Sequence, residues 1–184
     1  MRVVFVLFDS LNRLTLGCYG GSVVKTPNFD RLAERSVTFD THYVGSLPCI
    51  PARRDLLTGR LSFLHRSWGP IEPYDITFPE LLGQAGAYCH LVTDHFHYWE
   101  DGGATFHNRY DSYEFFRGQE GDPWMGLAAA PWDELRQRYH PIQFTERART
   151  KYKRRMLNDM LIKDDTDFPI QKCFRAGLDF LERN

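Results

Sequence analysis

An unbroken apolar run near the amino terminus places the strongest limit on how this chain can fold. Residues 3–8 read Val-Val-Phe-Val-Leu-Phe, and the run ends abruptly at Asp9 and Ser10. A continuous series of β-branched and aromatic residues is typical of a strand buried on both faces, as in a parallel sheet covered by helices. The run therefore predicts a central parallel strand and an α/β fold.

Two further segments predict the rest of such a fold. Residues 77–80, Thr-Phe-Pro-Glu, have the form of a capping box, and the apolar residues after them predict a short helix that ends at Gly86. Residues 87–92 follow as another strand, and the alternation at Val37, Phe39 and Tyr43 predicts one more. This alternation of strands and helices predicts a mainly parallel central sheet flanked by helices.

Asp9 stands where ligands usually bind in such a fold. In open α/β sheets, ligands gather at the carboxyl ends of the strands, and Asp9 directly follows the predicted first strand. Two interpretations of Asp9 remain open from the residues alone, because an acidic residue after a strand also commonly caps a turn.

Residues 49–60, Cys-Ile-Pro-Ala-Arg-Arg-Asp-Leu-Leu-Thr-Gly-Arg, predict a short helix with Cys49 at its start. Pro51 suits the first turn and Gly59 suits a left-handed stop. The N–H groups at a helix start attract anions and favour ionised forms, and Arg53 and Arg54 add positive charge within one turn. The pattern indicates a site for sulfate or phosphate, although a lone cysteine before a helix is more often a buried structural residue.

Asp94, His95 and His97 form a polar cluster just after the strand predicted at residues 87–92. If the strands are parallel, this cluster lies at the same edge of the sheet as Asp9 and Cys49. The alternative is a solvated, histidine-rich turn.

The composition excludes several other classes of protein. The 184 residues are 42% hydrophobic and 15% aromatic, which is enough for a substantial core in one domain. Lys and Arg number 23 against 24 acidic residues, so no overall field favours nucleic acid or an anionic membrane. The four cysteines lack disulfide-framework or zinc-motif spacing, and the N-terminal run is too short for a signal peptide or a membrane span. A cytoplasmic location is therefore expected for the chain as written.

Residues 49–60 also resemble the signature of the sulfatase family, within the alkaline-phosphatase-like superfamily. The matching positions are Cys49, Pro51, Arg53, Leu57, Thr58, Gly59 and Arg60. The resemblance extends upstream through Gly17-Cys-Tyr-Gly and through residues 26–33, Thr-Pro-Asn-Phe-Asp-Arg-Leu-Ala, where a helix is expected.

The resemblance implies a function and a set of site residues. It implies that Cys49 is oxidised by a formylglycine-generating maturation enzyme, and that the hydrated aldehyde attacks the sulfur of a sulfate ester. It assigns Arg53 to the formylglycine oxygens, His97 to catalysis, and Asp9 to a divalent cation, most naturally Ca²⁺, with Mn²⁺ or Mg²⁺ as alternatives. The formylglycine at position 49 would also contact the metal, and the expected substrate is a sulfated sugar.

The chain departs from the family pattern at two of these positions. Ser10 stands where a second Asp is common, which makes it an uncertain metal ligand and keeps a phosphonate or phosphate ester hydrolase of the same superfamily open. His95 stands where Lys is usual, and it is interpreted as a substrate contact rather than as a metal ligand.

The last third of the chain has a helical pattern. Residues 132–161 are rich in basic residues, with Arg147 and Arg149 among them, and a further amphipathic helix begins near Pro169. We interpret residues 132–184 as a helical part that can pass over the active site, because a solvated helical face fits better than a nucleic-acid patch.

No counterpart of the family's downstream metal ligands is evident, so residues 1–184 are expected to be the N-terminal part of one catalytic domain that is incomplete at its C-terminus. A catalytically silent remnant, kept as a binding or structural domain, is the remaining alternative.

Overall fold

A computed structural model describes residues 1–145 and 150–184 of the chain, so Arg147 and Arg149 lie outside the described residues. The α-helices are α1 (Pro27–Ala33), α2 (Cys49–Thr58), α3 (Phe78–Gln84), α4 (Trp132–Arg138), α5 (Thr150–Asp159) and α6 (Pro169–Arg183). The strands are β1 (His90–Thr93) and β2 (Ser112–Phe115). Short 3-10 helices cover Arg13–Thr15, Gly17–Tyr19, Ser62–Leu64, Phe96–Trp99, His107–Arg109, Pro141–Phe144 and Asp165–Asp167.

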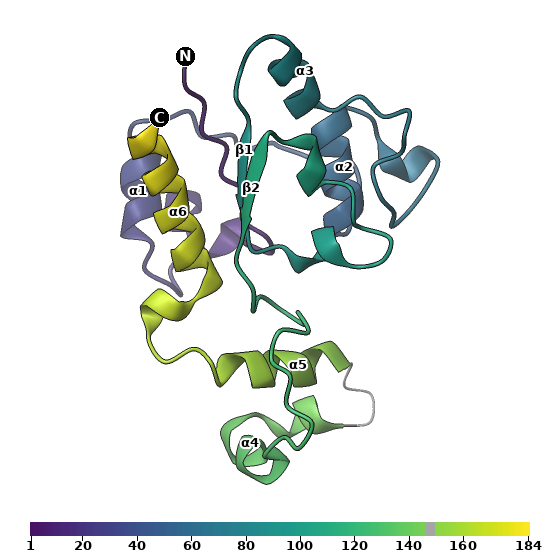
Figure 1. Cartoon of the computed structure of the whole chain (residues 1–184). Helices are drawn as coiled ribbons and strands as arrows, with labels where there is room; N and C mark the ends of the chain where they lie inside the picture. Colours follow the sequence, from purple (N-terminus) through teal and green to yellow (C-terminus); the bar gives the residue numbers. More distant parts are fainter. Residues whose placement is uncertain (146–149) are drawn as a thin grey trace.

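The two strands form a small parallel sheet. His90 lies opposite Ser112 and Thr93 lies opposite Phe115. Figure 1 shows α2 and α3 to one side of the sheet and α1 and α6 to the other. The fold is thus mixed α/β and mostly helical, with a parallel sheet as predicted but with fewer strands in the described part of the chain.

The predicted first strand is not a strand in the structure. Residues 3–8 have no strand assignment, and the exposed fractions of Val3 and Val6 are 76% and 52%. At the two ends of this segment, Arg2 donates to the carbonyl of Asn184 over 2.7 Å, and Phe8 packs against Phe174 of α6. Asn184 and Phe174 are about 15 Å apart along a helix, so the segment is stretched along α6, but no neighbouring strand among the described residues pairs with it. The strand predicted around Val37 is likewise absent from the described residues, and Val37 and Phe39 are exposed.

The helices predicted from capping signals do form. Thr77 precedes α3, and both its backbone N–H and its hydroxyl donate to Glu80, over 3.1 and 2.6 Å. Gly86 follows α3 with a left-handed φ of 84°. Thr26 precedes α1 but does not cap it, because its hydroxyl instead accepts a hydrogen bond from the N–H of Gly17.

The apolar interior consists of two separate clusters among the described residues. The first joins α2 to the segments around β1 and contains Ile50, Leu57, Ile71, Tyr98 and Phe106. The second lies in the region of α4 and α5 and contains Leu135, Met156 and Leu157. The first cluster supports the candidate site, because Ile50 adjoins Cys49 and Tyr98 follows His97 in the chain.

Among the described residues, none of the helices has the length and apolar character needed to cross a bilayer.

Candidate active site

Helix α2 holds Cys49 at its first turn. Ile50 and Leu57 are 0% and 3% exposed and anchor one face of the helix in the core. Gly59 ends the helix with a left-handed φ of 68°, which a residue with a side chain adopts at a cost. Cys49 itself is half-buried, so its sulfur lies at the boundary between this core and the site.

The two consecutive arginines of α2 do different work. Arg53 Nη2 donates to Asp9 Oδ2 over 3.2 Å, and its guanidinium lies 5.5 Å from the ring centroid of Tyr98. Arg54 is 2% exposed and makes a bidentate pair with Asp75, with distances of 2.8 and 3.0 Å. The prediction that both arginines add positive charge near Cys49 is therefore wrong for Arg54, whose charge is balanced by the buried carboxylate of Asp75.

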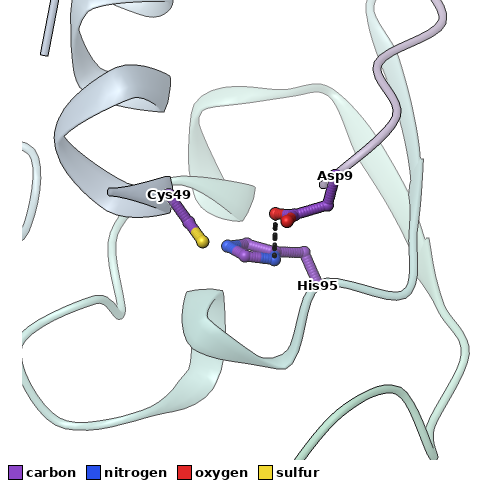
Figure 2. A group of neighbouring side chains, drawn as sticks. All are labelled: Asp9, Cys49 and His95. Atoms are coloured by element: carbon purple, nitrogen blue, oxygen red, sulfur yellow. Dashed lines mark ion pairs between the residues drawn. The ribbon is translucent and has the colours of Figure 1, made fainter. Parts of the chain in front are cut away.

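Asp9, Cys49 and His95 converge, although they are far apart in the sequence. One ligand-type atom from each residue lies within 4.8 Å of the others. Figure 2 shows the side chains of Asp9, Cys49 and His95 pointing toward one another. The distance from His95 Nδ1 to Asp9 Oδ2 is 3.7 Å. The end of the N-terminal segment, the start of α2 and the turn after β1 thus form one site.

Ser10 supports Asp9 in this arrangement. Its hydroxyl donates to Asp9 Oδ1 over 2.8 Å, and its backbone has a left-handed φ of 57°. Such a backbone is uncommon for a residue other than glycine and often marks a functional turn. The bond to Oδ1 orients the carboxylate, and Oδ2 faces Arg53 and His95.

His95 is the most buried member of the site. It is 1% exposed, and neither ring nitrogen has a hydrogen-bond partner among the described residues. Its backbone N–H donates to Thr93 Oγ1 over 3.0 Å, which fixes the turn after β1. Buried polar atoms are normally bonded, so two unpaired nitrogens on one buried ring point to an interaction that only a bound group can complete.

His97 lies next to this cluster and not within it. Its ring centroid is 5.0 Å from that of His95. Its Nδ1 lies 2.7 Å from Glu100 Oε1, as an ion pair without hydrogen-bond alignment, and its Nε2 lies 3.5 Å from Glu120 Oε2. Trp68 packs edge-on against the ring. The structure therefore places the predicted catalytic His97 beside His95 and between the carboxylates of Glu100 and Glu120.

The charges around Cys49 disfavour its thiolate. Burial, followed by the carboxylate of Asp9, raises the pKa of the Cys49 thiol to about 11, and the opposing effect of Arg53 is smaller. The expectation that the helix start and the arginines favour ionisation is thus wrong for the unmodified thiol. Burial would raise the pKa of Asp9, but the hydrogen bond from Ser10 and the charge of Arg53 outweigh it and lower that pKa below 3.8.

The two histidines have pKa values shifted in opposite directions. Burial, with the charges of Arg53 and His97, lowers the pKa of His95 to about 3. Burial also acts to lower the pKa of His97, but its close contacts with the carboxylates of Glu120 and Glu100 reverse this and raise it above 6.5. Near neutral pH, His95 is therefore a neutral imidazole beside a more basic His97.

Two residues that shape the site were not predicted from the sequence. The ring of Tyr98 contacts the guanidinium of Arg53 and packs edge-on against His95, with 5.1 Å between the ring centroids. Asp75 binds the side chain of Arg54, so that Arg54 does not contribute to the site. The His95-x-His97 cluster was a signal for neighbouring Tyr98. No signal in the sequence pointed to Asp75, because it lies in a loop and its partner, Arg54, is 21 residues away in the chain.

A half-buried cysteine at a helix start lies beside an arginine, a carboxylate and a neutral histidine, an arrangement that can bind an anionic group. The comparison with protein families identifies the family. The family model described as Sulfatase matches residues 2–155, and the chain belongs to the sulfatase family. Membership implies the alkaline-phosphatase-like fold.

Curated relatives are distant and much longer. The chain is 33% identical over 88 residues to the N-acetylglucosamine-6-O-sulfatase of Bacteroides thetaiotaomicron, an alignment that covers 46% of the chain and 16% of the relative. It is 41% identical over 62 residues to human arylsulfatase D, an alignment that covers 34% of the chain and 10% of the relative. It is 32% identical over 142 residues to dog arylsulfatase H, an alignment that covers 77% of the chain and 22% of the relative. These alignments thus span less than a quarter of each of these relatives. No solved structure matches the chain.

The family implies a metal and a formylglycine, and the donor atoms of the site test that expectation. Asp9 supplies carboxylate oxygen, and a formylglycine hydrate at position 49 would supply hydroxyl oxygen, both of which suit a hard cation such as Ca²⁺. The thiol of unmodified Cys49 and the imidazole of His95 supply sulfur and nitrogen, which suit Zn²⁺ instead. The expected cation therefore fits the chemistry of the site in the converted state of Cys49.

Proposed function

We propose that the chain carries the nucleophile-bearing part of a sulfuric ester hydrolase that acts on a sulfated sugar. The observation that carries the proposal is the convergence of Asp9, Cys49 and His95, with Arg53 on Asp9, at the start of α2. Membership of the sulfatase family supports the reaction class. The sugar is proposed because a relative over 46% of the chain is named as an N-acetylglucosamine-6-O-sulfatase.

The state of Cys49 supports a requirement for conversion to formylglycine. With a pKa of about 11, the thiol is protonated near neutral pH and is a poor nucleophile. A formylglycine hydrate supplies an oxygen nucleophile, and a divalent cation, proposed to be Ca²⁺ held by Asp9 and residue 49, would offset the charge on the sulfate. A maturation enzyme that generates formylglycine is the partner that this proposal requires.

The chain's own residues have distinct proposed roles around that centre. The guanidinium of Arg53 is held by Asp9 and by the face of Tyr98, so it presents its remaining donors to the formylglycine and the sulfate. His95, neutral and unpaired, is free to bond a sulfate oxygen. His97 is held by Glu100 and Glu120 and is more basic than an ordinary histidine, which suits a group that delivers a proton to the leaving oxygen.

The test is made on Cys49 itself. After production with a formylglycine-generating enzyme, the peptide containing residue 49 is expected to carry an aldehyde in mass spectrometry, and a Cys49→Ala variant is expected to lose all turnover of sulfate esters. Cys89→Ala is the matched control, because Cys89 is a free, half-exposed cysteine outside the site. Full activity of a protein whose Cys49 is an unmodified thiol would falsify the proposal.

One observation favours a second candidate, a phosphonate or phosphate ester hydrolase. Ser10 occupies the position of a second carboxylate, and its hydroxyl is bonded to Asp9. With one carboxylate fewer, the site repels a doubly charged phosphoryl group less. Rates on paired sulfate and phosphonate esters with the same leaving group distinguish the two: a higher kcat/KM on the phosphonate would replace the sulfatase proposal.

A further inference from the structure

The unmodified site has the donor chemistry of a zinc centre. The sulfur of Cys49, a ring nitrogen of His95 and a carboxylate oxygen of Asp9 lie within 4.8 Å of one another. Zn²⁺ prefers sulfur, nitrogen and oxygen ligands of this kind, and three protein ligands with one open position are its usual arrangement outside purely structural sites. Ca²⁺ takes six to eight oxygen ligands and does not suit this set.

The geometry is close to what zinc requires. Ligand atoms about 2.0–2.3 Å from a tetrahedral Zn²⁺ lie about 3.3–3.8 Å from one another. His95 Nδ1 and Asp9 Oδ2 are already 3.7 Å apart. Figure 2 shows the three side chains pointing toward one another from separate segments. No pair of ligand atoms is more than 4.8 Å apart, so reaching the zinc geometry requires each pair to close by at most about 1 Å.

The burial and bonding of His95 provide independent evidence for a ligand. The residue is 1% exposed, and both of its ring nitrogens lack a hydrogen-bond partner among the described residues. A ring in this state gains an interaction by binding a metal and gives up none. The 2.8 Å bond from Ser10 to Asp9 Oδ1 would persist as outer-sphere support, because Oδ2 is the oxygen that faces His95.

The charges of the site also suit one divalent ion. The carboxylate of Asp9 and a thiolate of Cys49 together cancel the two positive charges of Zn²⁺, and neutral His95 adds none. Arg53 contacts Asp9 over 3.2 Å and opposes a cation, but its guanidinium can stay stacked on Tyr98 when the contact loosens. Binding forms a sulfur–zinc bond and releases the thiol proton to the solvent.

We propose that the chain, while Cys49 is an unmodified thiol, binds one Zn²⁺ through Cys49, His95 and Asp9. The bound ion then covers the sulfur of Cys49. Conversion to formylglycine removes the sulfur and with it the preference for zinc. The binding itself requires no turnover, so it stands or falls independently of the proposed hydrolase activity.

The test uses the full, unconverted chain and Co²⁺ as a spectroscopic probe for Zn²⁺. We expect a near-ultraviolet thiolate-to-cobalt band and the visible bands of a tetrahedral ion, both removed by one equivalent of Zn²⁺. Cys49→Ser is expected to abolish the charge-transfer band, and His95→Gln and Asp9→Asn to weaken Zn²⁺ binding at least tenfold. Matched controls are Cys89→Ser and His42→Gln, because Cys89 is half-buried outside the site and His42 is exposed. Circular dichroism checks that each variant folds.

A second measurement needs no variant. Zn²⁺ is expected to slow alkylation of Cys49 by iodoacetamide at least tenfold in peptide mass spectrometry, with the rate at Cys89 unchanged. The proposal is overturned if Co²⁺ shows no thiolate band, if the band persists in Cys49→Ser, or if Zn²⁺ leaves the rate at Cys49 unchanged. Absence of sulfate ester turnover in the converted protein would contradict the hydrolase proposal and leave these results intact.

Discussion

Helix α2 and the N-terminal segment of residues 3–8 meet at the candidate site, yet they fold in opposite ways. Both were predicted as regular elements, the helix from Pro51 and Gly59 and the strand from its apolar run. In α2, Ile50 and Leu57 are 0% and 3% exposed, whereas Val3 in the N-terminal segment is 76% exposed. Helix α2 contributes Cys49 to the site, and Asp9 directly follows the N-terminal segment.

The difference follows from where each element finds its hydrogen bonds. A helix pairs its own N–H and C=O groups over four residues, so α2 needs the rest of the chain only for its buried face. A strand pairs with neighbouring strands, and among the described residues no backbone hydrogen bond joins residues 3–8 to another strand. An apolar run by itself thus ensures neither burial nor a strand, because a strand forms only where partners are present.

The largest expected effect tests the anchoring of α2. Arg54→Met removes one partner of the buried pair with Asp75 and is expected to lower the free energy of unfolding by about 3–5 kcal/mol in urea denaturation. Arg2→Met, just before the N-terminal segment, is the control, and it is expected to change that free energy by less than about 0.5 kcal/mol, because Arg2 is exposed. Equal effects of the two substitutions would remove the contrast between the regions.

The next effect compares two leucines. Leu57→Ala in α2 is expected to cost about 2–5 kcal/mol of unfolding free energy, because it leaves a cavity in the core. Leu7→Ala is expected to cost less than about 1 kcal/mol, because Leu7 is already 48% exposed. A loss at Leu7 as large as that at Leu57 would mean that the N-terminal segment is buried in solution.

A third effect, of a few kcal/mol, is a change in the free energy of unfolding with pH. The pKa of His95 is lowered from 6.5, so the unfolded chain binds more protons than the folded chain below pH 6.5, and stability falls as pH falls toward about 3. His95→Gln should flatten the pH dependence of the urea midpoint in that range.

The matched variant for this experiment is His97→Gln, with the opposite sign. The pKa of His97 is raised, so its contribution is fully present below pH 6.5 and is lost as pH rises through the raised value. The variant should therefore lose stability on the acid side. Ring titrations by NMR that give both histidines ordinary pKa values would contradict both expectations.

The smallest effect sharpens the account of how α2 ends. Gly59→Ala is expected to cost about 1 kcal/mol, because φ is 68° there and no atom within 4 Å would meet the added methyl group. Gly83→Ala in α3, also without a neighbour within 4 Å but without a left-handed φ, is expected to stabilise by about 0.5–1 kcal/mol. Thermal unfolding of the two variants should move in opposite directions, and a gain for Gly59→Ala would show that its conformation is not strained.

Local signals predicted the helices well and the sheet only in part. The capping box at Thr77 and Glu80 and the glycine at position 59 act within a few residues, so the sequence shows both of them directly. The prediction of a first strand at residues 3–8 was wrong, because strand formation depends on partners distant in the sequence. The roles of the site residues stay predictions, but their proximity could be anticipated from the edge of a parallel sheet.

The sequence by itself determined the family of the chain, the start and end of α2, and the chemical types present at the site, because each depends on residue identity or on contacts within a turn of helix. Only the tertiary structure decided that Arg53 rather than Arg54 faces Asp9, that His95 rather than His97 lies beside Cys49, and that the Cys49 thiol holds its proton. The physical reason is that neighbouring side chains on one segment point in different directions. The charge and the burial around each side chain are set by segments tens of residues away in the sequence.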